Sequence, residues 1–263
     1  IVLSQPRIPY GHLFTVGALI LIILAGHGQA PPEEAKATPR PARAKRSPTH
    51  QKTIAKRTQR PTFVEHGDLN SAKVALTFDA CEDNHPAGYD QNIIEILTSA
   101  KAPATLFLGG KWIDSHPTEA RALAANELFE LGNRSFGHPD FTRIGTEQAR
   151  QEISDTQDRL QTLTGKEAKF FRFPFGRYDQ GTLDLVGSLG LTAIQWTVVT
   201  GDPDRNVSAQ TIVNTVAKRA AGGSIVIMHM NGRGWNTAEA LPAIINDLRS
   251  RGLKLVTISD LLV

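Results

Sequence analysis

The sequence has a single cysteine, Cys81, among its 263 residues. One cysteine excludes an intramolecular disulfide framework and any thiolate zinc cluster. Metal chemistry in this chain must therefore use histidine and carboxylate ligands. The chain also lacks a serine nucleophile elbow, a phosphate-binding P-loop and a dinucleotide-binding glycine motif. These absences leave hydrolysis by an activated water molecule as the simplest reaction class.

Aromatic residues are few, at 6%, and charged residues make up 21% of the chain, against 40% hydrophobic residues. This is the composition of a globular protein, not of a wholly disordered one. The length favours one large α/β domain with some additional sequence over two full domains, because α/β barrels run to about 200–250 residues as one unit.

The net charge of +3 is unevenly distributed along the chain. Residues 31–61 hold nine basic side chains against Glu33 and Glu34, whereas residues 62–263 carry five more acidic than basic side chains. The basic stretch is rich in proline, alanine and threonine, which predicts a disordered linker over 31–61 with weak attraction for anionic surfaces. The remaining part is net acidic and lacks a basic aromatic face, so we expect no nucleic-acid partner.

An apolar run, LFTVGALILIILAG at residues 13–26, follows Arg7 and His12 and has the pattern of a secretory signal. It is shorter than the roughly 20 residues that cross a bilayer. Two interpretations of residues 1–30 stay open. One is a cleaved signal peptide, and the other is an uncleaved membrane anchor, because Pro31 makes a poor cleavage position. Both predict export to the periplasm, cell envelope or medium, and the anchor predicts membrane contact.

From about residue 62, apolar β-rich runs alternate with amphipathic helical runs. The expected strands span 73–79, 104–109, 128–133, 169–173, 191–199, 224–229 and 253–259. The expected helices span 91–100, 117–126, 146–164, 180–189, 208–221 and 237–250. This regular alternation predicts parallel strands with helices outside. Seven strands favour an α/β fold in the form of a distorted (β/α) barrel over 62–263, with a doubly wound open sheet as the competing architecture.

Unusual polar residues follow several of the expected strands, where a β/α barrel builds its active site. They are Asp79 with Asp83, His85 and Asp90, then Asn133 with Arg134 and His138, then Arg172, Asp202 and His229. A carboxylate facing a histidine provides a general base and a general acid, and a neighbouring arginine holds the carboxylate ionised. A further histidine could bind a metal that activates water. Cys81 is an alternative nucleophile, although a buried structural thiol is the favoured interpretation.

Five ordered motifs connect these residues to a known family. They are LTFDAC at Asp79, GNRSFGHPD at His138, RFPFG at Arg172, WTVVTGDPD at Asp202 and IVIMHMNGRGWNTAEALP at His229. With them, residues 72–263 resemble the polysaccharide deacetylases of the NodB-homology type, carbohydrate esterase family 4. The resemblance implies a distorted barrel, a divalent metal that is usually zinc, and hydrolysis of N- or O-acetyl groups on a cell-envelope or extracellular polysaccharide.

The resemblance also implies roles for individual residues. Asp79 would be the catalytic base with Arg172 as its tether, and His229 would be the general acid tuned by Asp202. The backbone N–H near Phe175 would help to hold the oxyanion. Side chains expected to contact the sugar are Trp235, Tyr178 and Tyr89, together with Arg134.

Two positions depart from the family pattern. Ala80 stands where the family usually has a metal-binding aspartate, and Arg134 stands where it has the first of two histidines, which leaves only His138. Three explanations stay open. Asp83, His85 or Asp90 could supply replacement ligands, Arg134 could polarise the acetyl carbonyl without a metal, or the site could bind polysaccharide without cleaving it. A hydrolase is favoured, because both the acid and the base persist.

Overall fold

The computed structural model describes residues 63–83 and 85–263. The expected signal or anchor segment, 1–30, and the expected linker, 31–61, lie outside the described residues. Within the described part, no helix combines the length and the apolar character needed to cross a membrane.

The described residues form a single sheet of nine strands, and all of its pairings are parallel. The strands are β1 (Phe63–Val64), β2 (Lys73–Ala80), β3 (Ala104–Leu108), β4 (Phe129–Asn133), β5 (Phe170–Phe171), β6 (Thr192–Ile194), β7 (Val198–Val199), β8 (Ile225–His229) and β9 (Lys254–Val256). The α-helices are α1 (Gln91–Ser99), α2 (Gly110–Ser115), α3 (Pro117–Ala125), α4 (Thr146–Thr164), α5 (Gln180–Ser188), α6 (Ala209–Arg219), α7 (Thr237–Ser250) and α8 (Ile258–Leu261). Two 3₁₀ turns lie at Phe141–Arg143 and Pro174–Gly176.

The strand order is β1-β6-β5-β4-β3-β2-β8-β7, with β9 paired to the first residues of β2. β6 lies near one end of this order and β7 at the other, yet only residues 195–197 connect them. Three residues are too short to cross an open sheet, so the sheet must curl until its two ends approach each other. This curl confirms the distorted (β/α) barrel and contradicts the doubly wound open sheet.

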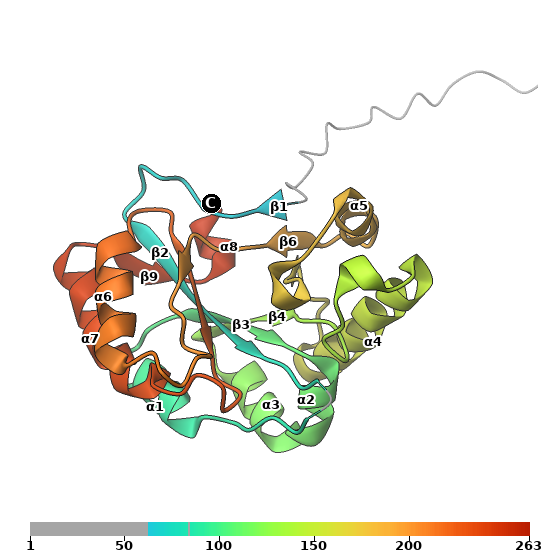
Figure 1. The fold of residues 1–263 in the computed structure, drawn as a ribbon, viewed down its shortest axis with the longest axis horizontal. Helices are drawn as coiled ribbons and strands as arrows, with labels where there is room; N and C mark the ends of the chain where they lie inside the picture. The colour runs from blue at the N-terminus through green and yellow to red at the C-terminus, as the bar shows by residue number, and fades with distance from the viewer. Residues whose placement is uncertain (1–62, 84) are drawn as a thin grey trace, which may run out of the picture. The chain divides into compact units, whose positions relative to one another are not determined.

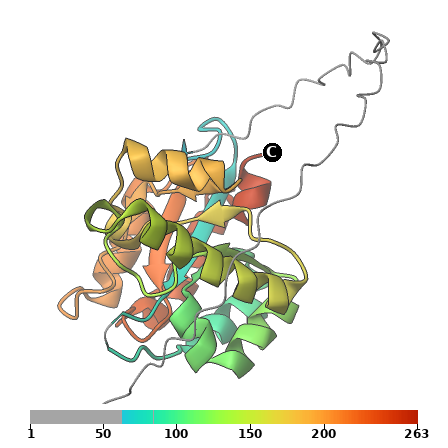
Figure 2. The same ribbon diagram turned by 90° about the vertical axis from the view of Figure 1, so that its right-hand side faces the viewer.

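The two faces of β2 explain how the barrel is filled. Leu76 and Phe78 belong to a large apolar cluster with residues of α1 and α7, which cover the outside of the sheet. Figure 1 shows α6 and α7 on one side of the domain and α4 on the other, and Figure 2 shows α4 and α5 from that second side. Because side chains alternate along a strand, Thr77 and Asp79 face the opposite way from this cluster. The sequence KVALTFDA therefore places a carboxylate inside the barrel.

Several element boundaries differ from the sequence-based expectations. The expected strand at 191–199 is two strands, because the chain changes partners between them: Gln195 N donates to Val64 O at 2.8 Å, and Thr197 N donates to Ile225 O at 3.0 Å. The expected strand at 253–259 ends at Val256. The helix α8 follows it, and Thr257 caps the first turn of that helix. The sequence did not predict β1 or α2, which are too short to carry a periodic pattern.

Candidate active site

Asp79 and His229 lie opposite each other at the carboxyl ends of two neighbouring strands. They are register partners in the parallel pair of β2 and β8. Asp79 is fully buried, whereas the His229 side chain is partly exposed. This pairing places the expected base and the expected acid side by side, as the position of each residue at a strand end predicts.

Arg172 follows β5 and holds one oxygen of Asp79. Its Nη1 donates to Asp79 Oδ1 at 2.8 Å and to Thr77 Oγ1 at 2.8 Å. The guanidinium is fully buried and lies over the Phe107 ring, 4.0 Å from its centroid. The Asp79 carboxylate is therefore fixed in orientation by a charged group that cannot turn to solvent.

Arg134 follows β4 and lies against the second oxygen of the same carboxylate. Its Nε is 2.9 Å from Asp79 Oδ2, in an ion pair without hydrogen-bond alignment. Its Nη1 donates to the main-chain oxygens of Arg172 and Phe173. Asp79 is thus enclosed between two buried arginines.

These charges set the protonation of the buried groups. Burial alone would raise the pKa of Asp79, but attraction to Arg134 and then to Arg172 outweighs it and lowers that pKa below the ordinary 3.8. Burial lowers the pKa of Arg172 to about 10, so that arginine is still charged at pH 7. Asp79 is consequently an ionised but weakly basic carboxylate.

Asp202 holds the other half of the site. Its Oδ1 lies 3.1 Å from His229 Nδ1, and its Oδ2 accepts from His229 N at 2.6 Å. Thr200 Oγ1 donates to Oδ1 at 2.9 Å, and Thr237 Oγ1 donates to Oδ2 at 2.8 Å. An ionised carboxylate can only accept, so Nδ1 carries its proton toward Asp202 and Nε2 is the nitrogen left for a substrate.

A glycine lets the loop after β8 approach this pair. A Cβ atom on Gly234 would lie 2.2 Å from His229 O and 3.1 Å from Asp202 Oδ2. The next residue, Trp235, donates its main-chain N–H to Asp202 O at 3.2 Å. Any larger residue at position 234 would push the loop away, so this glycine keeps the main chain before Trp235 close to His229 and Asp202.

His138 lies in the loop after β4, beside Phe175. The two rings meet edge to face, with centroids 4.7 Å apart, and both residues line a cavity of about 330 Å³. His138 is 7% exposed, and neither ring nitrogen has a hydrogen-bond partner among the described residues. Burial, followed by the charge of Arg134, lowers the pKa of His138 to about 3, so the ring is neutral at pH 7.

The loop after β2 does not supply the expected replacement ligands. Asp83 pairs with Arg233, whose Nη2 is 3.0 Å from its Oδ2. Asp90 caps α1, and His85 points to solvent although it borders the cavity. Across residues 63–83 and 85–263, no group of three or more histidine, cysteine, aspartate or glutamate side chains could hold a metal ion. Asp83 and Asp90 have other partners in this structure, so these residues do not gather around His138 as a set of ligands.

Cys81 follows the same strand and is buried. Burial raises the pKa of its thiol to about 11. A thiol with that pKa is almost entirely protonated at pH 7 and is a poor nucleophile. The structure therefore agrees with the structural interpretation of Cys81.

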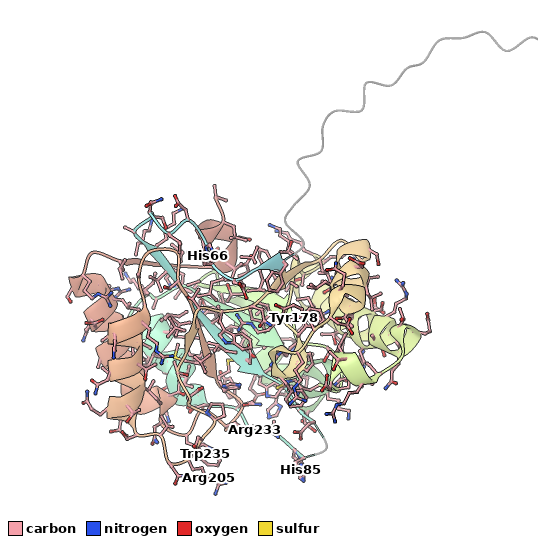
Figure 3. All side chains as sticks on the ribbon, turned by 45° about the horizontal axis from the view of Figure 1, so that its top comes forward. His66, His85, Tyr178, Arg205, Arg233 and Trp235 are labelled. Atoms are coloured by element: carbon pink, nitrogen blue, oxygen red, sulfur yellow. The ribbon has the colours of Figure 1, made fainter. Side chains whose placement is uncertain are left out.

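The aromatic residues expected to contact sugar differ in position. Trp235 is 45% exposed and carries the guanidinium of Arg205 over its ring at 3.9 Å. Figure 3 shows these two residues together at one edge of the domain, with His66 at the opposite edge. Tyr178 packs against Phe63 and Phe173, and Tyr89 packs on the core, which leaves Trp235 as the best sugar platform.

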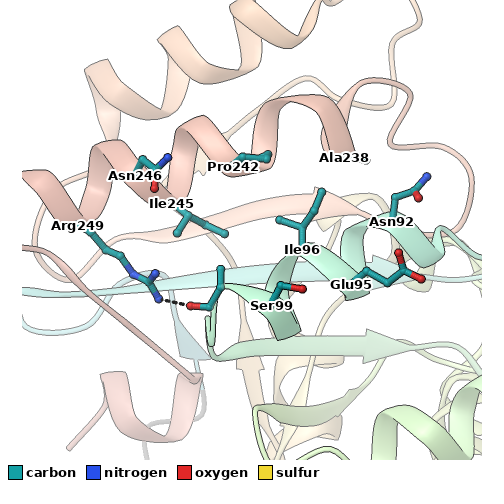
Figure 4. A pocket seen from close by; sticks show the side chains of 10 residues that line it. Asn92, Glu95, Ile96, Ser99, Ala238, Pro242, Ile245, Asn246 and Arg249 are labelled. Carbon is teal, nitrogen blue, oxygen red and sulfur yellow. Dashed lines mark hydrogen bonds between the residues drawn. The ribbon is translucent and has the colours of Figure 1, made fainter.

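A larger groove lies away from these groups, between α1 and α7. It has a volume of about 790 Å³ and is shown in Figure 4. Its charged residues are Glu95 and Arg249, and Arg249 Nη2 donates to Ala100 O at 2.8 Å. The groove is lined by one carboxylate and no histidine, so it lacks the acid–base pair of the candidate active site.

Sequence reasoning missed several residues that support the site. Thr77 had a signal, because it lies two residues before Asp79 and so on the same strand face. Asn231 is buried after β8 and donates from Nδ2 to Cys81 O at 2.6 Å, which ties two loops together. Arg233 carried no signal, since an arginine in a glycine-rich loop usually faces solvent.

A buried carboxylate and a partly exposed histidine lie side by side at the carboxyl ends of the barrel strands, an arrangement suited to general acid–base chemistry. The polysaccharide deacetylase family matches residues 66–194. A peptidoglycan-N-acetylglucosamine deacetylase of Bacillus cereus is 31% identical over 201 residues, which cover 76% of this chain and 71% of the relative. The chain belongs to the polysaccharide deacetylase family.

Solved structures of this family superpose on the chain. One is a peptidoglycan N-acetylglucosamine deacetylase, with a TM-score of 0.71 and 30% identity over 77% of this chain and 93% of the other. Another is a family 4 pseudoenzyme from Bacillus anthracis, with a TM-score of 0.69 and 27% identity over 78% and 70% of the two chains. A mutant of that pseudoenzyme is described as having restored enzymatic activity.

The resemblance to this family implies a divalent metal, and the residues that the structure describes do not provide a site for one. Ala80 has no donor atom and packs among buried apolar residues. Arg134 places a cation against Asp79 where a second imidazole would be expected. His138 alone does not form a zinc site, which normally takes three protein ligands.

Proposed function

We propose that this chain is a hydrolase that removes acetyl groups from an acetylated cell-envelope polysaccharide of the peptidoglycan or chitin-like kind. One observation carries the proposal: Asp79 and His229 are register partners, and each is held by its own charged residue, Arg172 or Asp202. The peptidoglycan deacetylase named above supports the substrate class.

The proposed reaction uses side-chain and main-chain groups of this chain alone. Asp79 accepts a proton from the attacking water, and His229 Nε2 donates a proton to the leaving nitrogen or oxygen of the sugar. Arg134 and the main-chain N–H of Phe175 stabilise the developing oxyanion. Because two arginines weaken Asp79 as a base, we expect slow turnover.

A second function is favoured by the Arg134 contact. The two arginines beside Asp79 stabilise its ionised form, so this carboxylate is a weak proton acceptor. The likeness to the B. anthracis pseudoenzyme points the same way. In this alternative the chain binds polysaccharide through Trp235 and the cavity at His138 without cleaving it.

Acetate release separates the two functions. Purified full chain is incubated with peptidoglycan, chitin oligomers and acetylated xylan, and free acetate is measured. Hydrolysis should depend on Asp202, so Asp202→Asn should reduce acetate release about 100-fold or more. Asp204→Asn is the matched control, because Asp204 lies in the same loop but is exposed, and its side chain accepts hydrogen bonds only from Asn206 among the described residues. Glycan binding without acetate release from any substrate would contradict the hydrolase and favour the binding protein.

We also propose that residues 1–61 are an export segment and a linker, so that the protein acts in the cell envelope or outside the cell. The deacetylase domain should then fold without them. A chain starting at residue 62 is expected to melt within about 4 °C of the full chain, because a change in unfolding free energy below about 1 kcal/mol shifts Tm no further at this size. Calorimetry of both chains provides the measurement. Loss of the cooperative transition in the shorter chain would place the boundary elsewhere.

A further inference from the structure

The three nitrogens of Arg134 have different surroundings. Nε lies against Asp79 Oδ2 at 2.9 Å, and Nη1 is satisfied by the main-chain oxygens of Arg172 and Phe173. Among the described residues, Nη2 has no hydrogen-bond partner. The side chain is 3% exposed, so Nη2 has less contact with bulk water than the donors of a surface arginine have.

The backbone fixes Arg134 as firmly as its side chain. Its main-chain N–H donates to Leu108 O at 3.0 Å, which continues the β3–β4 ladder past the end of β4. Ser135 and His138, in the same loop, adopt positive φ angles of 63° and 58°. Non-glycine residues adopt this conformation only where the surrounding structure imposes it, so the loop that joins Arg134 to His138 is tightly determined.

His138 adds a second group without a partner. Its ring is buried to more than nine-tenths, borders the cavity of about 330 Å³, and leaves both Nδ1 and Nε2 unpaired among the described residues. A neutral imidazole offers one N–H donor and one acceptor. A ligand oxygen could accept a hydrogen bond from this donor. A hydrogen bond is stronger in a buried site than at the surface.

A divalent ion cannot share this place with Arg134. A guanidinium cannot lose its proton at ordinary pH and would repel a cation bound at the Asp79 carboxylate, with little screening in a buried site. Arg134 could not turn away without giving up two main-chain acceptors and leaving Asp79 Oδ2 unpaired.

We propose that Arg134 is the resident cation of this site. Its positive charge replaces that of the family's metal, so the chain binds its ligand without a metal. Arg134 Nη2 and the His138 ring donate hydrogen bonds to the carbonyl oxygen of an acetamido group. The inference rests on the proposed polysaccharide ligand but not on hydrolysis, since a binding protein would use the same contacts.

Metal analysis and a binding assay test the inference. Wild-type full chain is dialysed against zinc, and its metal content is measured by mass spectrometry. We expect well below one equivalent. Binding of a tetramer of N-acetylglucosamine is then measured by calorimetry, with and without excess EDTA. The affinity should agree within about twofold in the two conditions, since the binding contacts come from the protein alone.

Substitution of Arg134 then tests its contact with the tetramer. Arg134→Met should weaken binding about 10- to 100-fold, the equivalent of one charge-assisted hydrogen bond. Arg134→Lys keeps the charge but not the fork of donors, so it should recover only part of the affinity. Arg150→Met is the matched control, because Arg150 is a surface arginine that pairs with Glu147.

Two results would overturn the inference. One is a full equivalent of zinc in the wild type. The other is tetramer binding that is absent or abolished by EDTA. Both use the unaltered chain, so they decide even where a variant fails to fold. Acetate release is a separate readout: if it is absent while EDTA-resistant binding persists, the hydrolase proposal fails and this inference stands.

Discussion

The double variant Ala80→Asp/Arg134→His is expected to bind one zinc ion and to gain metal-dependent deacetylation. It restores both ligand types that the chain lacks and removes the guanidinium that lies 2.9 Å from Asp79. Together with His138, the new side chains give the three protein ligands that a catalytic zinc site normally uses. The mutant of the B. anthracis pseudoenzyme with restored activity shows that a relative of similar fold can be converted.

Stability gives a second measurement for this variant. Ala80 is fully buried, so an aspartate there is costly until a cation neutralises it. Zinc that binds only the folded state at about 1,000 times its Kd stabilises by about 4 kcal/mol, which raises Tm by about 8–16 °C for a domain of this size. Wild type should show no such shift with zinc.

The single variants are the controls. Arg134→His alone offers two imidazoles and no carboxylate ligand, and Ala80→Asp alone leaves the guanidinium in place to pair with the new carboxylate. Neither should bind zinc as tightly as the double variant, so the two substitutions should be strongly non-additive. Equal zinc affinity in wild type and double variant would show that Arg134 does not exclude the metal.

The strand ends could be predicted from the sequence for a simple reason. A buried apolar run that terminates in Asp79 or His229 specifies both a strand and the position of its polar end. Parallel strands bring their carboxyl ends to one edge, so these residues had to lie on the same side of the barrel. This conclusion does not depend on the order of the strands. It therefore holds although the expected strands at 191–199 and 253–259 have other boundaries in the structure.

The contact between Arg134 and Asp79 could not be predicted in the same way. β4 is not a neighbour of β2, because β3 lies between them. Whether their ends meet depends on the curl of the sheet and on the conformation of a long side chain, and local sequence determines neither. The partners of Asp83 and Asp90 escaped prediction for a related reason, since loop carboxylates pair with whatever cation or helix end the fold brings near.

The substitution Asp79→Asn is expected to destabilise the protein strongly, besides removing the proposed base. Asp79 is the anion between two buried guanidiniums, Arg134 and Arg172. Without its charge, two buried cations face each other, and breaking a buried ion pair on one side costs about 3–5 kcal/mol. The corresponding fall in Tm is about 6–20 °C for a domain of this size. An assay of this variant must therefore be made well below its lowered Tm before a loss of acetate release is assigned to chemistry.

The pH dependence of the lost unfolding free energy shows whether Asp79→Asn acts by breaking ion pairs or by a simple packing defect. A carboxyl group whose pKa is lowered on folding contributes stability above its unfolded pKa, here 3.8, and loses that contribution as the pH falls toward the folded value. Urea unfolding should therefore show a large difference between wild type and Asp79→Asn at pH 7 and a smaller one below about pH 3.8. Asp114→Asn, which breaks the surface pair with Arg159, should cost no more than about 1 kcal/mol. Adding Arg134→Met to Asp79→Asn should recover part of the stability, because it removes one of the two facing cations. A difference that is equal at both pH values, with no recovery in the double variant, would mean that the charges around Asp79 do not hold this part of the barrel together.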